Sequence, residues 1–347
     1  MKAAITAVGG YVPASVLDNK TISETVQTTE DWIQKRTGIK QRRIALGKGT
    51  SDLACAAIDN LMENYQVDPA EIDGLLLATA TPDHILAPTA AKVCRMSGLV
   101  NAFGMDLNAA CSGFLFALEM AAGMIESGRY QKIIVAGADK MSSIVDYEDR
   151  STCILFGDGA GAVLLEKTGS GYGMMRSILR SDGSGTASLL VPAGGSKFPA
   201  SMQSIVHRKH YIKQDGSLVF KKAVEAMSGV SQEALEHNGW NAQDLDWMVP
   251  HQANLRIINA VGENLKIPSE KIKVNIEKYG NTTSATVPLC LWDFAADFKA
   301  GDNMLITTFG AGFSWGALCL KWGVMREKKM QNEVKTALEN KNVLALQ

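Results

Sequence analysis

The feature that most constrains this fold is an order of segments that occurs twice along the chain. In each half an acidic helix end runs into an apolar strand, a second strand turns into a helix, and a later apolar strand carries closely spaced glycines. The corresponding segments are 71–81 and 244–251, 100–111 and 271–284, and 153–165 and 304–320. We expect the last pair to be glycine hairpins and the repetition to reflect a duplication, although glycine-rich turns also recur by chance. Strands that alternate with helices in this way predict a layered α/β architecture.

The expected domain organisation follows from this repetition. The Gly- and Ser-rich stretch 169–186 predicts the boundary between an N-terminal half, residues 1–168, and a C-terminal half, residues 169–325. Residues 326–347 predict a short amphipathic C-terminal extension, with a solvated tail as the alternative. Its apolar residues on one helical face are Met330, Val334, Ala337 and Leu338.

Composition excludes several classes of function. Apolar residues make up 46% of the chain and charged residues 20%, which is enough to bury a sizeable core. The formal net charge of −1 gives no overall attraction to nucleic acid or to an anionic membrane, so we expect neither partner. No apolar run reaches the length of about 18 residues that a membrane-spanning helix needs. The first expected strand, Ala3–Val8, begins so close to Met1 that we expect no signal peptide and predict a cytoplasmic protein.

The cysteines and histidines predict neither disulfides nor a metal site. The six cysteines contain no Cys-x-x-Cys pair, and most of them lie in apolar surroundings. This pattern is typical of reduced thiols in the cytoplasm. The five histidines show no metal-ligand spacing, so we expect no metal.

Cys111 is the first candidate for chemistry, because it lies where a turn enters a helix. The apolar residues that follow it recur at helical spacing, and they are Phe114, Leu115, Leu118, Ala121, Ala122 and Ile125. A thiol in the first turn of a helix lies near the positive end of the helix dipole, which favours the thiolate and predicts a lowered pKa. The alternative is a small core cysteine.

Two further polar residues lie at comparable places in the second half. His251 directly follows an apolar strand, and Asn281 lies in the turn of the sequence Gly-Asn-Thr. Either residue alone is more typical of structure, as a hydrogen-bonded histidine or as a turn asparagine. If the two halves pair about a pseudo-two-fold axis, however, Cys111, His251 and Asn281 can meet in one cleft.

A set of motifs extends this pattern from residue 2 to residue 322. They are Val8–Pro13 (VGGYVP), Thr29–Ile33 (TEDWI), Arg36–Ile39 (RTGI), Asn108–Phe114 (NAACSGF), Phe156–Gly161 (FGDGAG), His251–Asn254 (HQAN), Gly280–Thr282 (GNT) and Phe309–Gly316 (FGAGFSWG). With these motifs the chain resembles the β-ketoacyl-acyl carrier protein synthase III family of the thiolase superfamily. The resemblance implies a five-layered α-β-α-β-α fold built from two duplicated halves, and a homodimer. It implies an acyltransferase that initiates type II fatty acid synthesis, condensing an acyl-CoA primer with malonyl-acyl carrier protein to give 3-oxoacyl-acyl carrier protein and CO₂.

The resemblance also implies roles for the three polar residues. Cys111 attacks the primer thioester and carries the acyl group as a new thioester. The backbone N–H groups of Cys111 and of Ala311, or in another register Gly312, hold the oxyanion. His251 Nε2 and the Asn281 amide both donate hydrogen bonds to the enolate that forms when malonyl thioester loses CO₂. CoA and phosphopantetheine are substrates in this reaction, so no cofactor is expected.

Substrate contacts are implied in the same way. The residues implied in binding are Trp32, Arg36 and Arg150 at the adenine, Phe220 and Asn254 at the pantetheine arm, and Ala87, which reaches across the dimer to the acyl pocket. The residues implied in docking an acidic carrier protein are Gln252, Arg256, Lys221 and Lys222. Without the resemblance, Trp32, Arg36 and Arg150 are more typical of a helix-end aromatic and two surface arginines. For the lysines the alternative is a solvated charged face.

Three alternatives are distinguished by residue type. Thiolases use a second cysteine in the C-terminal glycine-rich turn, and here residues 309–313 contain none. Elongating synthases have histidine in the third catalytic position, where this chain has Asn281. A non-catalytic partner subunit is disfavoured because all three catalytic residue types are present. A related acyltransferase of polyketide or other secondary metabolism remains an alternative.

Overall fold

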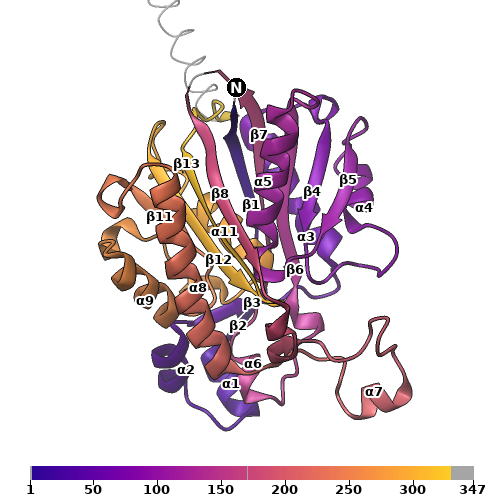
Figure 1. Ribbon diagram of the computed structural model, residues 1–347. Helices are drawn as coiled ribbons and strands as arrows, with labels where there is room; N and C mark the ends of the chain where they lie inside the picture. Colours follow the sequence, from indigo (N-terminus) through magenta and orange to yellow (C-terminus); the bar gives the residue numbers. More distant parts are fainter. Residues whose placement is uncertain (1, 170, 330–347) are drawn as a thin grey trace, which may run out of the picture.

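Two β-sheets form the frame of the protein, and helices lie between them and on their outer faces (Figure 1). This computed structural model describes residues 2–169 and 171–329. The apolar face expected for the C-terminal extension begins at residue 330 and lies outside the described residues.

The first sheet has five strands in the order β1-β7-β6-β4-β5. These strands are β1 (Lys2–Tyr11), β7 (Asp158–Thr168), β6 (Lys132–Lys140), β4 (Gly74–Ala78) and β5 (Phe103–Leu107). The pairs β1–β7 and β7–β6 are antiparallel, and the pairs β6–β4 and β4–β5 are parallel. Strand β4 is buried along its whole length, as its uninterrupted apolar sequence predicts for a central parallel strand.

The second sheet repeats this arrangement. Its strands are β8 (Gly173–Ser181), β13 (Ser314–Lys321), β12 (Asn303–Gly310) and β11 (Trp247–Pro250), in that order. Their pairings are antiparallel, antiparallel and parallel, as in β1-β7-β6-β4. At the place that β5 occupies in the first sheet, Ile272 forms an isolated parallel bridge with Met248 of β11. The repeated order of segments in the sequence therefore corresponds to two sheets of matching topology.

The helices complete five layers and confirm the expected α-β-α-β-α fold. Helices α5 (Gly113–Glu126) and α11 (Thr286–Asp293) pack between the two sheets. Helices α3 (Thr50–Tyr65) and α4 (Thr89–Met96) cover the outer face of the first sheet. Helix α8 (Gly216–His237) covers the outer face of the second sheet, and α9 (Leu255–Leu265) packs against α8.

Helix α5 shows why the middle layer forms from this sequence. A helix that is apolar on most of its surface has to be buried, and small residues allow sheets to approach it closely. The six apolar positions expected on its core side are all buried, and they are Phe114, Leu115, Leu118, Ala121, Ala122 and Ile125. The expected helix after Cys111 is therefore confirmed.

Short elements gather at one end of the two sheets, at the bottom of Figure 1. They are β2 (Val16–Asp18), α1 (Asn19–Thr25), α2 (Glu30–Thr37), β3 (Gln41–Arg43), α6 (Arg150–Cys153), β9 (Leu189–Leu190), α7 (Met202–Val206), β10 (Lys213–Gln214) and α10 (Ile276–Tyr279). Several of them supply walls of the cavity described below.

Only one of the two expected glycine hairpins forms. Strands β12 and β13 make the second one, with Gly310 paired to Ser314. The first is wrong, because the glycines of segment 153–165 lie inside or directly before β7. These glycines serve close packing: a Cβ atom on Gly161 would lie 2.7 Å from the backbone nitrogen of Leu289 in α11.

The expected linker is also shorter than the stretch 169–186. Residues 173–181 of that stretch form β8, an edge strand of the second sheet. Serine and glycine are compatible with a strand here because β8 pairs along one side with β13.

Two expectations from composition can be compared with the described residues. All six cysteines are free thiols, as predicted. Among the helices in the described part of the chain, none combines the length and apolarity needed to cross a membrane.

Candidate active site

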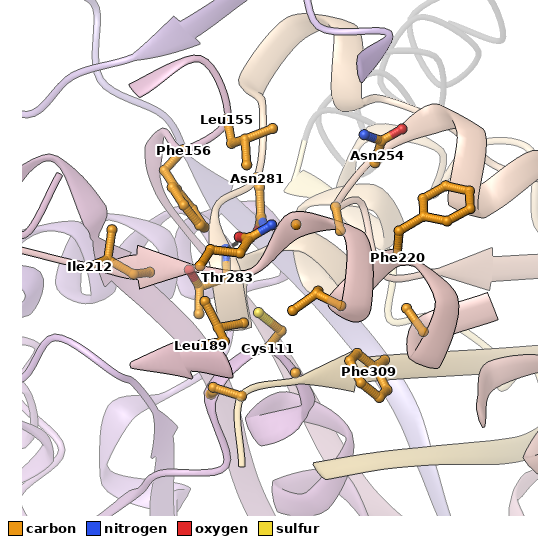
Figure 2. A pocket seen from close by; sticks show the side chains of 18 of the residues that line it. Cys111, Leu155, Phe156, Leu189, Ile212, Phe220, Asn254, Asn281, Thr283 and Phe309 are labelled. Atoms are coloured by element: carbon orange, nitrogen blue, oxygen red, sulfur yellow. Dashed lines mark hydrogen bonds between the residues drawn. The ribbon is translucent and has the colours of Figure 1, made fainter. Parts of the chain in front are cut away.

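Cys111, His251 and Asn281 line one cavity of about 840 Å³. In Figure 2 Cys111 lies between two groups of side chains. Phe156, Leu189 and Ile212 lie on one side, and Phe220 and Asn254 lie on the other. The predicted meeting of the three polar residues in one cleft is thus present in the structure.

The turn that presents Cys111 has an unusual backbone. Ala110, directly before it, has φ of 47° in the left-handed region, and the Asn108 side-chain oxygen accepts a hydrogen bond from the Ala110 N–H at 3.1 Å. A short 3₁₀ turn, Ala110–Ser112, then leads into α5. Non-glycine residues in this region are uncommon and concentrate at functional sites.

The same turn occurs in the second half. Thr283 has φ of 55°, and the Asn281 side-chain oxygen accepts a hydrogen bond from the Thr283 N–H at 2.9 Å. Because Asn281 Oδ1 is engaged in this way, its Nδ2 group remains as a donor toward the cavity. In this correspondence Ser284 matches Cys111, and Asn281 matches Asn108.

His251 follows β11 directly and is held by its backbone and its ring. Its N–H donates to the carbonyl of Thr307 at 2.8 Å, and its Nδ1 lies 2.7 Å from the Thr286 hydroxyl oxygen. Burial lowers the pKa of His251 to about 3, because desolvation disfavours the charged ring. The imidazole is therefore neutral near pH 7 and can accept or donate one proton at Nε2.

The expected lowering of the Cys111 pKa is wrong. Burial, followed by the negative field of Asp139, raises the pKa of Cys111 to about 12. The cost of placing a thiolate in a closed cavity exceeds the benefit of the helix start. The thiol is therefore protonated near pH 7, so its proton has to leave as the sulfur attacks.

Two backbone N–H groups are available beside the thiol. Within residues 2–169 and 171–329, the N–H groups of Cys111 and Ala311 donate to no acceptor in another residue, and the Cys111 N–H lies against its own thiol sulfur. The absence of a side chain at Gly310 lets the turn that carries Ala311 lie against the turn that carries Cys111. A Cβ atom on Gly310 would lie only 2.8 Å from the Cys111 nitrogen. Ser112 and Ser314 hold the two turns together: Ser112 Oγ donates to the Ser314 carbonyl, and Ser314 Oγ donates to the Ala109 carbonyl, both at 2.9 Å.

The outer part of the cavity carries the residues expected at the CoA. The Arg150 guanidinium lies over the Trp32 ring, 5.2 Å from its centroid, and Arg36 lines the cavity beside them. Asn254 caps the start of α9 and donates to the carbonyl of Arg36 at 3.2 Å. These residues come from α2, α6 and α9, so the tertiary fold brings together motifs that are distant in the sequence.

Arg256, two residues after Asn254, lies over the ring of Phe220 at 5.1 Å. Lys221 and Lys222 are on the same helix as Phe220 but do not line the cavity, and Lys222 pairs with Glu225 at 3.6 Å. These three cations lie at or beside the entrance and not near Cys111.

One expected site residue is placed differently, and a second stays untested. Gln252 is only 1% exposed, and its amide bonds the backbone of Pro250, Lys273 and Asn275, so a carrier protein cannot contact it. The reason is that the residue after His251 turns inward to hold the strand end. Ala87 lies in the exposed loop 82–88, outside the cavity of its own protomer, so its expected place at the acyl pocket of a partner stays a prediction.

Sequence reasoning missed several residues of the site. Asp139 is buried and accepts hydrogen bonds from residues 79–81 and from Ser284, which fixes the turn that follows Asn281. Thr286 contacts His251, as described above. Further walls of the cavity are Met141, Ile144, Leu189, Val191, Ile212 and Phe309. No periodicity marks these apolar residues, because they come from short elements.

Comparison with known proteins gives the family. The family model described as 3-oxoacyl-(acyl carrier protein) synthase III matches residues 105–183, and the model of its C-terminal part matches residues 235–322. A beta-ketoacyl-(acyl carrier protein) synthase III of Phocaeicola vulgatus is 50% identical over 331 residues, covering 95% of this chain and 99% of the relative. The chain belongs to the 3-oxoacyl-(acyl carrier protein) synthase III family.

Solved structures of synthase III proteins agree with this assignment. The 3-oxoacyl-(acyl carrier protein) synthase III of Aquifex aeolicus is 38% identical with a TM-score of 0.86, and the match covers 92% of this chain and all of that one. A priming β-ketosynthase of a polyketide pathway is 34% identical with a TM-score of 0.85, and the match covers 92% of this chain and 96% of that one. The synthase III proteins of Phocaeicola vulgatus, at 50% identity, and of Aquifex aeolicus, at 38%, are thus more similar to this chain than this priming ketosynthase, at 34%.

Proposed function

We propose that this synthase III transfers the acyl group of an acyl-CoA primer to Cys111 and condenses it with malonyl-acyl carrier protein. The products are 3-oxoacyl-acyl carrier protein, CO₂ and CoA, and the reaction initiates fatty acid synthesis. One observation carries the proposal: a thiol, a neutral imidazole and an amide donor line one enclosed cavity, without a second cysteine in the turn at residues 309–313.

The first half-reaction uses Cys111 as the nucleophile. Its thiol attacks the primer thioester, and the neutral His251 ring is able to take the thiol proton at Nε2. The free N–H groups of Cys111 and Ala311 stabilise the oxyanion. The collapse of the tetrahedral intermediate releases CoA, which takes the proton, and leaves the acyl group on the sulfur.

The second half-reaction uses His251 and Asn281. Malonyl thioester loses CO₂, and the electron pair of the broken C–C bond forms an enolate. Neutral donors at His251 Nε2 and Asn281 Nδ2 stabilise the thioester oxygen, and the enolate carbon then attacks the acyl group on Cys111. The C–S bond to Cys111 breaks, and the sulfur takes the Nε2 proton, which a proton from solvent replaces on the ring. The orientation of the Asn281 amide supports this role, because its oxygen is already engaged by Thr283 N–H.

The carrier protein and CoA approach the entrance of the cavity. Carrier proteins are acidic, and Arg256 with Lys221 and Lys222 gives the entrance a positive rim. The stacked pair Trp32 and Arg150 is suited to hold an adenine. The chemistry needs no metal and no further cofactor, and we assign the protein to the cytoplasm.

A second copy of the chain completes the proposed enzyme. Strand β5 is the edge of the first sheet, and the adjacent loop 82–88 exposes Ile85 by 90% and Leu86 by 94%. Pairing of two such edges covers these apolar side chains. In this homodimer Ala87 of one protomer lies at the acyl pocket of the other.

Product analysis tests the function. The purified protein is incubated with malonyl-acyl carrier protein and with acetyl-, isobutyryl-, isovaleryl- or longer acyl-CoA, and the carrier-bound products are identified by mass spectrometry. We expect 3-oxoacyl-acyl carrier protein that contains the primer carbons, and equimolar CO₂. Absence of a condensation product with every primer would falsify the proposal.

A further inference from the structure

The hydroxyl group of Thr286 lies between a ring nitrogen of His251 and a backbone carbonyl oxygen. Its oxygen is 2.7 Å from His251 Nδ1 and 3.0 Å from the carbonyl oxygen of Thr283. Thr286 is the first residue of α11 and is 2% exposed, while His251 is 3% exposed. Water therefore has little access to this contact, and the two side chains have to satisfy each other.

The hydroxyl carries one proton, so two arrangements are possible. When Thr286 donates to the Thr283 carbonyl, its oxygen accepts from Nδ1–H of His251, and Nε2 is unprotonated. When Thr286 donates to Nδ1, the ring proton is on Nε2. Both neutral tautomers of His251 keep a hydrogen bond at Nδ1, and the ring need not move between them.

The proposed function requires both tautomers at different stages. An unprotonated Nε2 accepts the proton of the Cys111 thiol, whose pKa is raised to about 12 by burial and by Asp139. A protonated Nε2 donates to the enolate oxygen. We propose that Thr286 is a positioning residue whose hydroxyl pairs with Nδ1 in both tautomers of His251, so that Nε2 serves as acceptor in acylation and as donor in decarboxylation. The inference rests on the proposed function.

The protons balance over the two half-reactions. The S–H bond of Cys111 breaks as the S–C bond forms, and the proton passes to Nε2. When the thioester C–S bond of the primer breaks, the sulfur of CoA takes this proton and leaves His251 protonated at Nδ1. After CoA has left, the ring changes tautomer by exchange with solvent: Nε2 takes a proton from water in the cavity, and Nδ1 loses its proton when the buried contact with Thr286 opens briefly. The Thr286 hydroxyl then turns its proton from the Thr283 carbonyl to Nδ1. When the acyl group leaves Cys111 for the enolate carbon, the sulfur takes the Nε2 proton and Nδ1 regains one from solvent, which restores the free enzyme with one solvent proton consumed.

A matched pair of substitutions separates the hydroxyl from the shape of the side chain. Thr286→Val keeps the branched shape and removes the hydroxyl, and Thr286→Ser keeps the hydroxyl. Asn281→Ala is the comparator, because Asn281 is expected to act in decarboxylation alone. Acylation is measured as CoA release in a single turnover, and decarboxylation is measured as CO₂ release from malonyl-carrier protein by acyl-enzyme.

We expect Thr286→Val to slow both half-reactions by about 10- to 100-fold at unchanged KM, as loss of a buried hydrogen bond to a catalytic base implies. Thr286→Ser should stay within about threefold of the wild type, and Asn281→Ala should slow decarboxylation only. In 15N NMR of histidine-labelled protein, with His251→Asn used to assign the signal, wild-type His251 should change its tautomer between the free enzyme and the acyl-enzyme.

Three results would overturn the proposal. The first is a Thr286→Val enzyme with wild-type rates in both half-reactions. The second is an equal loss in Thr286→Ser, which would indicate that shape alone matters. The third is a His251 tautomer that acylation leaves unchanged. If the wild type forms no acyl-enzyme at all, the proposed function itself fails, which is a distinguishable result.

Discussion

Asn108 and Asn281 make the same hydrogen bond at matching places in the two halves. Each side-chain oxygen accepts from the N–H group two residues later, at 3.1 Å and 2.9 Å respectively. The outcome differs because Asn108 leads to the thiol of Cys111, whereas Asn281 leads to Ser284, which is tied to Asp139. One turn therefore presents a nucleophile and the other presents an amide, and the cavity needs both halves.

Substitution of the three polar residues should separate the half-reactions. Cys111→Ala should abolish acyl-enzyme formation, since it removes the nucleophile. Asn281→Ala should still be acylated but should fail to decarboxylate malonyl thioester. His251→Ala should also lose decarboxylation, and it should be acylated more slowly because the proton acceptor is absent. Mass spectrometry after incubation with acyl-CoA gives the measurement, and a label on Cys153 or Cys290 contradicts the assignment of the nucleophile.

Gly310→Ala should damage acylation more than stability. The added Cβ atom would lie 2.8 Å from the Cys111 nitrogen and 3.0 Å from the Cys111 Cβ, so the turn must shift away from the oxyanion position. Loss of one such donor typically lowers kcat by about 100-fold or more. The matched control is Ala311→Gly, which keeps the N–H group and should remain active. Equal activity of both variants in the CoA-release assay argues against an oxyanion site here.

Acid should destabilise the fold through His251. The pKa of His251 is about 3 in the folded protein and 6.5 in a model peptide, so between these values the unfolded state binds more protons. The free energy of unfolding therefore falls as the pH is lowered, by about 1.4 kcal/mol per pH unit from this group alone. Between pH 7 and pH 5 the wild type should lose about 2 kcal/mol more than His251→Asn in urea unfolding. If the free energy of unfolding of the two proteins falls equally between pH 7 and pH 5, the prediction is wrong.

Arg256→Glu should distinguish the carrier protein from free CoA. Arg256 lies at the entrance over Phe220, and only the carrier brings a large acidic surface to that rim. The reversed charge should raise KM for malonyl-carrier protein by about tenfold and leave the use of malonyl-CoA nearly unchanged. Lys222 already pairs with Glu225, so Lys222→Glu should raise KM for malonyl-carrier protein by less. Equal losses with both donors would assign Arg256 to the pantetheine or to the fold.

Ala87→Phe should narrow the range of primers. In the proposed homodimer a phenylalanine at this position fills part of the acyl pocket, and each excluded methylene contributes about 0.8 kcal/mol of burial. The ratio of kcat/KM for six-carbon or branched primers to that for acetyl-CoA should therefore fall by tenfold or more. A wild type that strongly prefers acetyl-CoA, together with an Ala87→Phe enzyme that is unchanged, shows that Ala87 does not gate the pocket.

The sequence was sufficient for the architecture and for the centre of the site. Periodic and uninterrupted apolar segments predict elements such as α5 and β4, because burial alone determines them. Cys111, His251 and Asn281 were found because their residue types are tied to the chemistry and they follow strands or turns. The two sheets have matching topology, and their segments are similar enough for the repetition to be detected in the sequence.

The remaining features depend on three-dimensional surroundings. The pKa of Cys111 is governed by burial and by Asp139, and these residues are separated in the sequence. The glycines of β7 were read as a turn, although their reason is the close approach of α11. Gln252 has the residue type of a surface contact, but its side chain is buried. Thr286 has the residue type of an ordinary helix start, and only the folded structure shows its contact with His251.

The edge strand β8 has a consequence for biosynthesis. Its strand partner is β13, the final strand of the second sheet, so β8 leaves the ribosome long before residues 314–321 exist. At ordinary rates of translation this delay is on the order of ten seconds. During that time an unpaired strand is open to wrong partners and to chaperones, and the segment that carries Ala311 has not been made. A nascent chain truncated before Ala311 should therefore be both aggregation-prone and inert.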